Sequence, residues 1–290
     1  MLKSEVARSS WGAAFIKALE IFEPEPQRLF NDLLIPQLMP YGYRMLLKSM
    51  KVKPIRKWML QKIEIKGRGV RGALLSRTRY IDDVLRDSMN HEISQVVLLG
   101  TGMDTRPYRY PSNKDIVFYE VDYPDVLTFK KKRLTRILKS LPPSVCYVPL
   151  DFQLESLEQG LADTDFTLDK KTLYIWEGVT QYISRDAANH VMQYVSGSKK
   201  GSQLVFTYIE KRFIDQMETA TEFNPKFQKT LKRIWINGYD PVKLPQYLSS
   251  YGFFLHEDVG KEEFLDRYLN SLHRSMDLLN MERILLAEKV

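Results

Sequence analysis

The stretch Val96-Val97-Leu98-Leu99-Gly100-Thr101-Gly102-Met103-Asp104 joins a short apolar run to a glycine turn and an acid. Four consecutive apolar residues without polar alternation are typical of a strand that is buried on both faces of a parallel sheet. The two glycines let the backbone turn tightly and let a ligand approach it closely. In open α/β sheets, ligands bind at the carboxyl ends of the strands. The stretch therefore predicts a buried strand that ends at a ligand-binding site.

Six further β-rich runs accompany this first strand, which we place at residues 95–99. They span residues 116–121, 145–148, 172–176, 203–209, 253–256 and 283–287. Helical patterns lie between several of them, at 125–139 and 185–196 for example, and strands spaced by helices predict βαβ units with right-handed crossovers. We expect an α/β fold with a doubly wound, mostly parallel seven-stranded sheet and an N-terminal helical layer.

The predicted secondary structure of the chain changes near residue 90. Residues 1–90 hold mostly helical patterns interrupted by prolines, and we predict that they form an N-terminal helical cap. Residues 91–290 would form the α/β core, with an insertion at 211–250 that contains a helical stretch at 225–236. This insertion is either a cover over the substrate site or a packed helical pair.

The composition is that of a globular protein, with 290 residues, 44% hydrophobic and 27% charged. Its single cysteine, Cys146, lies in an apolar run, which excludes an internal disulfide and predicts a buried structural thiol. Lys3, Glu5 and Arg8 precede any apolar stretch, unlike a secretory signal, and no run of about 18 apolar residues predicts a membrane span. These features favour the cytoplasm.

The net charge of +7 is concentrated in one stretch, residues 44–71. Ten basic residues there face a single acid, Glu64: Arg44, Lys48, Lys51, Lys53, Arg56, Lys57, Lys62, Lys66, Arg68 and Arg71. The stretch is either a set of solvated helix faces or a docking surface for a phosphate-bearing carrier, nucleic acid or a membrane. Nucleic acid is disfavoured because the stretch lacks interleaved stacking aromatics and no nucleic-acid module is recognisable.

The glycine turn matches neither common nucleotide motif. A phosphate loop requires a following Gly-Lys-Ser/Thr, which is absent, and a dinucleotide fingerprint requires a third glycine where Thr105 stands. Asp104 instead suggests a partner for the ammonium group of an amino-acid-like ligand. The motif by itself predicts only that a ligand approaches the backbone there.

Acids at the ends of the next three strands make the prediction more specific. Asp122 lies 22 residues after Gly100, where an acid can accept hydrogen bonds from ribose hydroxyls; the alternative is a helix N-cap. Asp151 follows the third strand and is placed for an adenine amino group, and Glu177 follows the fourth. Glycine and three acids at four successive strand ends predict one nucleoside-binding edge of the sheet.

Five segments give the chain a family resemblance from about residue 75 to 185. They are Arg77-Thr78-Arg79-Tyr80-Ile81-Asp82-Asp83, Leu99-Gly100-Thr101-Gly102-Met103-Asp104-Thr105-Arg106, Glu120-Val121-Asp122-Tyr123-Pro124, Pro149-Leu150-Asp151 and Glu177-Gly178-Val179. With these motifs the chain resembles the leucine carboxyl methyltransferase-like family of class I S-adenosylmethionine-dependent methyltransferases, and within it the bacterial small-molecule O-methyltransferases. The first 70 residues carry no motif of the family.

The resemblance implies S-adenosyl-L-methionine as cofactor and a role for each matching residue. Arg77, or else Arg79, would hold the methionine carboxylate, since a guanidinium grips a carboxylate with two hydrogen bonds; the alternative for both is a surface salt bridge to Asp82 or Asp83. Further cofactor contacts implied are Gly100, Gly102 and Asp104 at the methionine part, Asp122 at the ribose, Asp151 and Phe152 at the adenine, and Glu177 at the amino group or reacting centre.

The chain departs from the carboxyl methyltransferases after the third strand. Those enzymes carry an arginine soon after the acid, whereas this sequence reads Asp151-Phe152-Gln153. The neutral Gln153 disfavours a carboxylate acceptor and favours a hydroxyl on a small natural-product-like molecule. A hydroxyl benefits from a general base, and Tyr182 and His256 are the candidates. The remaining histidines show no metal-ligand spacing with one another or with Cys146, so we predict no metal.

The sequence thus predicts an S-adenosylmethionine-dependent O-methyltransferase for a small molecule, free or presented on an acidic carrier protein. One alternative is a carboxyl methyltransferase that forms a methyl ester on a small acid or a protein C-terminus. The other is a non-catalytic cofactor-binding partner subunit.

Overall fold

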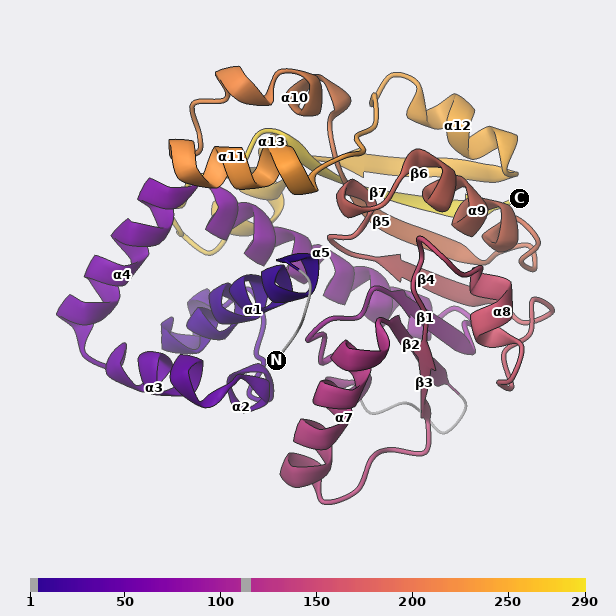
Figure 1. Ribbon diagram of the computed structural model, residues 1–290, viewed down its shortest axis with the longest axis horizontal. Helices are drawn as coiled ribbons and strands as arrows, with labels where there is room; N and C mark the ends of the chain where they lie inside the picture. The colour runs from indigo at the N-terminus through magenta and orange to yellow at the C-terminus, as the bar shows by residue number, and fades with distance from the viewer. Residues whose placement is uncertain (1–4, 111–115) are drawn as a thin grey trace.

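The computed structural model describes residues 5–110 and 116–290, and for residues 5–9 the backbone only. A seven-stranded sheet with the order β3-β2-β1-β4-β5-β7-β6 crosses the molecule (Figure 1). Every pairing is parallel except those of β7, which runs antiparallel to both β5 and β6. The strands are β1 (Gln95–Leu99), β2 (Val117–Asp122), β3 (Val145–Pro149), β4 (Thr172–Trp176), β5 (Gln203–Ile209), β6 (Phe253–Val259) and β7 (Glu282–Lys289). The predicted doubly wound, mostly parallel sheet is confirmed.

Unbroken apolar runs make the central strands, because both faces of the sheet are covered. Val96 and Leu98 of β1 pack into one buried cluster together with α5 (Val70–Met89). Val97 and Leu99 point the other way, into a cluster that includes α8 (Leu157–Leu161) and α9 (Arg185–Val195). Alternate residues of one strand therefore serve two cores, as the period of two in a strand requires.

An N-terminal helical layer lies beside the carboxyl edge of β1 and β2. It comprises α1 (Glu5–Ala18), α2 (Ile35–Leu38), α3 (Tyr41–Ser49) and α4 (Lys53–Lys66). Trp11, Phe15 and Met50 belong to a third buried cluster that extends to Met103 and to Val126 of α7 (Pro124–Leu138). The next helix, α5, packs on β4 and β5 and is part of the main core. The division of the chain at residue 90 stays a prediction.

The segment 211–250 forms three helices, α10 (Lys211–Asp215), α11 (Pro225–Ile234) and α12 (Leu244–Ser250). Whereas α12 packs on β6, the start of α11 is joined to the end of α4. The Arg68 amide donates to the Glu222 carbonyl at 2.7 Å, and the Asn224 amide donates to the Lys66 carbonyl at 3.1 Å. These bonds hold α11 against the N-terminal layer. Two four-residue helices complete the elements named here, α6 (Arg106–Arg109) and α13 (Lys261–Phe264).

Cys146 lies half-buried in β3, where burial raises the pKa of its thiol. A raised pKa disfavours the reactive thiolate, in line with a structural thiol. Among the helices of the described residues, none combines the length and the apolar character that crossing a membrane would require.

Candidate functional site

A cavity of about 980 Å³ opens at the carboxyl ends of β1, β2 and β4. One part of its wall comes from the glycine turn and from residues 12–17 of α1, which lies across it. The other part comes from Ile63 and Lys66 of α4, from α11, and from the 3₁₀ turn Thr180–Tyr182 after β4. Helices that are far apart in the sequence thus cover the edge where the strand-end residues converge.

The glycine turn has a backbone that other residues would strain. Gly100 has φ +75°, and a Cβ atom there would lie 2.3 Å from the Val179 Cγ2 atom. Gly102 has φ +49°, and its amide donates to an Asp122 Oδ2 atom at 2.6 Å. Only glycine adopts this region at low cost, so the turn both follows the strand closely and leaves space above it.

Asp122 terminates β2 and is 8% exposed at the wall of the cavity. Burial raises the pKa of its carboxyl to about 6, although the amides of Gly102 and Tyr123, which donate to it at 2.6 and 2.7 Å, oppose the rise. These bonds fix the carboxylate at the edge of the cavity.

Glu177 follows β4 and lies among three cations. Its carboxylate accepts bonds from the Lys17 Nζ atom at 2.8 Å, the Arg106 Nη1 atom at 2.8 Å and the Arg77 Nε atom at 3.2 Å. Burial by itself would raise the pKa of Glu177, but Lys17, Arg106 and Arg77 hold it well below its usual value. Glu177 is therefore ionised at neutral pH, and α1 is joined to β4 through it.

Arg106 is fully buried beneath this cluster. It donates to Asp82 at 2.6 Å, to the Thr78 carbonyl at 3.1 Å and, as a close ion pair, to Asp104. The pKa of Asp82 is lowered because Arg106 and Arg109 outweigh the effect of burial. A buried arginine with several carboxylate partners fixes their positions, and removing it would leave uncompensated charges.

Glu282, the first residue of β7, also lines the cavity and forms a close ion pair with Arg77. Burial raises the pKa of Glu282, and Arg77 only partly compensates. Tyr182 lines the cavity as well, half-buried and close enough to influence Arg77 electrostatically. The cavity wall thus combines the Glu282 carboxyl, whose pKa is raised, with the Tyr182 phenol.

The leucine carboxyl methyltransferase family model matches residues 10–196, which is more than half of the chain. The chain belongs to the leucine carboxyl methyltransferase family. This confirms the resemblance, and with it a methyltransferase whose cofactor is S-adenosyl-L-methionine.

Individual relatives agree with the family. A Mycobacterium marinum protein named "Putative S-adenosyl-L-methionine-dependent methyltransferase" is 27% identical over 202 residues, 68% of this chain and 67% of that protein. A Bacillus subtilis protein of the same description, YktD, is 26% identical over 206 residues, 68% of this chain and 66% of that protein. This chain thus spans about two thirds of the length of both relatives.

The fold agrees with a solved structure of low sequence identity. A crystal structure from Streptomyces avermitilis, described as a duf574 family protein, superposes with a TM-score of 0.53 at 14% identity, over 96% of this chain and 97% of that one. At this identity the match concerns the fold alone.

Most of the residues that the sequence predicted for this family site line the cavity: Arg77, Gly100, Gly102, Asp104, Asp122, Phe152, Glu177 and Tyr182. Asp151 lies beside it rather than in its wall and accepts a bond from the Gln153 amide at 2.9 Å. The two predicted arginines differ in their partners. Arg79 pairs with Asp83 one helical turn away, as the salt-bridge alternative expected, whereas Arg77 faces the cavity.

His256 lies elsewhere. It belongs to β6, the outermost strand beyond β7, where its side chain is 43% exposed and contacts Glu288 at 3.2 Å. The prediction ended this strand at residue 256, but β6 continues to Val259, so His256 lies within the strand and not at the site. We therefore no longer assign it a catalytic role.

Three residues of the site carried no predicted role: Lys17, Arg106 and Glu282. Arg106 ends the motif that begins at Leu99, and the position of Glu282 depends on the direction of β7. Because β7 runs antiparallel, its amino end meets the carboxyl ends of β4 and β5. Lys17 comes from a helix 160 residues before its partner, and nothing local signals the contact. In the part of the chain that the structure describes, no group of three or more His, Cys, Asp or Glu is arranged to hold a metal ion.

Proposed function

We propose that this methyltransferase transfers the methyl group to a hydroxyl of a small, natural-product-like molecule with an apolar or aromatic body. The observation that carries the proposal is the composition of the cavity wall away from the glycine turn. Phe223, Phe227 and Trp235 line it together with the buried carboxylate of Glu282. Such a wall suits an apolar acceptor that presents a proton, and it repels an acceptor that presents a carboxylate.

The residues near the glycine turn fit the cofactor. Arg77 would bind the methionine carboxylate, Asp122 the ribose hydroxyls and Phe152 the adenine, while Gly100 and Gly102 line the cavity with backbone and no side chain. When bound, S-adenosylmethionine supplies a methyl group on a sulfonium centre. The protein contributes alignment of the two reactants and exclusion of water, for which α1 and α11 provide the cover.

A hydroxyl acceptor needs its proton removed. A phenol has a pKa near about 10, so most of it is protonated at neutral pH, and a general base therefore accelerates its reaction. We assign this role to Glu282, whose raised pKa favours proton acceptance, with Tyr182 orienting the hydroxyl. The buried Gln181 Oε1 and Trp235 Nε1 atoms have no hydrogen-bond partner among the described residues, and they are free to bind polar groups of the acceptor.

Carboxyl methylation is the second candidate, because the name of the family favours it. A carboxylate needs no base, but it needs a cation. Lys17 and Arg77 are both paired with Glu177, and Gln153, which replaces the arginine of the carboxyl methyltransferases, is exposed and outside the cavity wall. Lys66 and Lys226 are the cations of the described wall that could face such an acceptor. An acceptor presented on a carrier protein is a variant of the first proposal, supported by the basic stretch 44–71 alone.

Labelled methyl transfer to matched phenols, alcohols and carboxylic acids tests the proposal. We expect a base-stable methyl ether, and we expect Glu282→Gln to lower kcat at least tenfold with cofactor affinity retained. Glu288→Gln, on the same strand but exposed, is the matched control. A base-labile product formed from the acids alone would establish the carboxyl methyltransferase instead. Tight cofactor binding without turnover of any acceptor, free or carrier-bound, would favour the non-catalytic partner subunit.

A further inference from the structure

The outer surface of α4 is unusual for a helix that packs on a protein through one face. All the residues of α4 that are partly buried lie on its inner side, where Met59, Leu60 and Ile63 pack against the third cluster. The opposite side of such a helix is normally polar. Here it carries Ile55, Trp58 and Ile65, all exposed, with Trp58 54% exposed.

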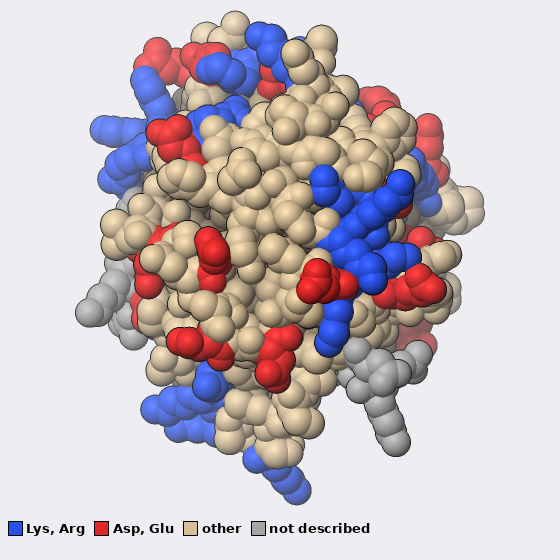
Figure 2. Space-filling model, turned by 90° about the vertical axis from the view of Figure 1, so that its right-hand side faces the viewer, with Lys and Arg blue, Asp and Glu red and all other residues tan. Residues whose placement is uncertain are grey.

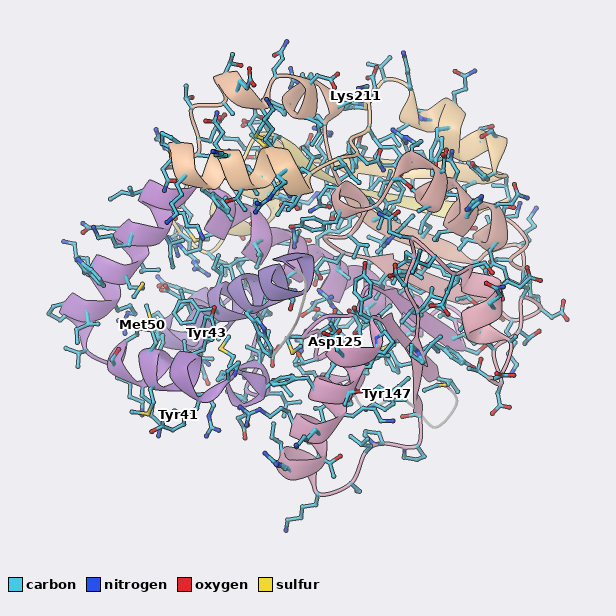
Figure 3. The ribbon with its side chains drawn as sticks, in the orientation of Figure 1. Tyr41, Tyr43, Met50, Asp125, Tyr147 and Lys211 are labelled. Atoms are coloured by element: carbon cyan, nitrogen blue, oxygen red, sulfur yellow. The ribbon has the colours of Figure 1, made fainter. Side chains whose placement is uncertain are left out.

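These apolar residues form one row. Residues 55, 58, 62 and 65 recur at intervals of three and four, so they lie along a single side of the helix. Val52, just before α4, and Met45 and Tyr41 on α3 extend the exposed apolar surface. Figure 3 shows that Tyr43 and Met50 point inward between the helices, whereas Tyr41 points away from the fold. Seven of the twelve large exposed apolar side chains of the described residues fall between residues 33 and 65.

Exposed lysines border the row. Lys57 lies on one flank and Lys66 on the other, Lys62 lies within the row itself, and Lys48, Lys51 and Lys53 continue the charge onto the α3–α4 corner. Lys48, Lys51, Lys53, Lys57 and Lys62 make no ion pair with any described carboxylate. Four other members of the basic stretch have partners within the fold, since Arg68 pairs with Asp277, Arg71 pairs with Glu64, Arg56 packs on Phe22 and Lys66 packs on Phe227.

The face opposite α4 has a different distribution of charge. α4 lies at the left-hand margin of the molecule (Figure 1), and Figure 2 views the molecule from the right-hand side. On that face acidic and basic side chains are interspersed over an uncharged surface. The mixed charges of that face differ from the run of lysines along α4.

We propose that the outer face of α4 and the α3–α4 corner dock on an anionic lipid bilayer. Lysines attract the negative surface of such a bilayer, and an indole with neighbouring aliphatic side chains inserts at the boundary between headgroups and acyl chains. A folded acidic protein would complement the lysines equally well, so binding to soluble polyanions without binding to vesicles is the outcome that would favour it. The proposal is independent of the acceptor, because Ile55, Trp58 and Ile65 do not line the cavity.

Vesicle binding tests it directly in the full chain. Trp58 is the one tryptophan that is exposed, since Trp11, Trp176 and Trp235 are at most 9% exposed. Adding vesicles of 70% phosphatidylcholine and 30% phosphatidylserine should shift tryptophan emission to shorter wavelength and carry the protein into the pellet. Pure phosphatidylcholine should do neither. Trp58→Phe should abolish the emission shift, and Trp58→Ser with Ile65→Ser should release the protein from the pellet.

Variants that remove lysines test how much each positive charge contributes to vesicle binding. Each basic residue near an anionic leaflet contributes about a factor of five to partitioning, so Lys57→Gln with Lys62→Gln should weaken binding roughly 25-fold. Lys199→Gln with Lys200→Gln, exposed lysines elsewhere, is the matched control and should not weaken it. The proposal is overturned if the protein stays in the supernatant with anionic vesicles, or if it binds soluble polyglutamate or DNA but not vesicles. Pelleting without a Trp58 emission shift would also overturn it.

Discussion

The proposed contact of Asp122 with the cofactor ribose predicts that cofactor affinity depends on pH, because the pKa of Asp122 is raised. Burial raises that pKa to about 6, so the carboxyl is almost wholly ionised at pH 7.5 and only about one tenth ionised at pH 5.0. An ionised carboxylate accepts bonds from both ribose hydroxyls, and the protonated form loses one acceptor. Affinity for the demethylated cofactor should therefore be constant above pH 7 and fall as pH drops through 6, by up to about tenfold at pH 5.0.

The assay is calorimetric titration of the demethylated cofactor between pH 5.0 and 7.5, on protein shown by circular dichroism to remain folded. Asp122→Asn should bind about thirtyfold more weakly at pH 7.5, because hydrogen bonds to a charged group are stronger by about 1 kcal/mol each, and its affinity should not vary with pH. Asp169→Asn, exposed and distant from the cavity, should behave as the unaltered protein.

Two outcomes would refute the reasoning. One is a pH-independent affinity in the unaltered protein. The other is a fall that persists in Asp122→Asn but disappears in Glu282→Gln, which would assign the titration to Glu282. Histidine offers no competing explanation, since none of the four lines the cavity: His91, His190, His256 and His273.

Three further changes have outcomes set by particular contacts. Gly100→Ala places a Cβ atom 2.3 Å from the Val179 Cγ2 atom at positive φ and should cost about 2 kcal/mol of unfolding free energy in urea, whereas Gly42→Ala, in open space, should cost nothing. Lys130→Met leaves the buried Glu120 without its cation, so it should cost about 3–5 kcal/mol of unfolding free energy, and adding Glu120→Leu should recover at least half of it. No recovery in the double variant would show that the pair itself stabilises the fold. Tyr182→Phe should lower kcat at least tenfold with cofactor affinity unchanged; an unaltered kcat would remove Tyr182 from the mechanism.

The sequence predicts the sheet because its strands are apolar runs. The predicted strands end too early, or begin too late, where a polar residue belongs to the strand. β2 extends to Asp122 and β7 begins at Glu282. Both residues are buried and carry hydrogen-bond or ion-pair partners, which is how a polar group is tolerated inside a sheet. An apolar criterion for strands places such residues in loops.

The residues of the site also differ in whether the order of elements along the chain is enough to predict their position. Asp122 and Glu177 follow from a rule about strand ends, which needs only the order of elements along the chain. Lys17 does not, because its position depends on how α1 packs over the finished sheet. Glu282 required the direction of β7, and a run of residues has no feature that distinguishes a parallel from an antiparallel strand. His256 does not lie at the cavity, because β6 continues to Val259 beyond the apolar run that ends at His256.

The charge cluster at the cavity suits a ligand that carries both signs. In the structure Arg77 has two carboxylate partners and Glu177 has three cationic ones, so every charge is already compensated. A ligand with a single charge would leave one buried group uncompensated, at a cost of several kcal/mol. In the proposed binding mode, the methionine part of the cofactor supplies a carboxylate to Arg77 and an ammonium group to Glu177 at the same time. Arg77 and Glu177 would then exchange protein partners for cofactor groups, and the net charge of the cluster would not change. For this reason the charge cluster is compatible with the cofactor although its own ion pairs are already formed.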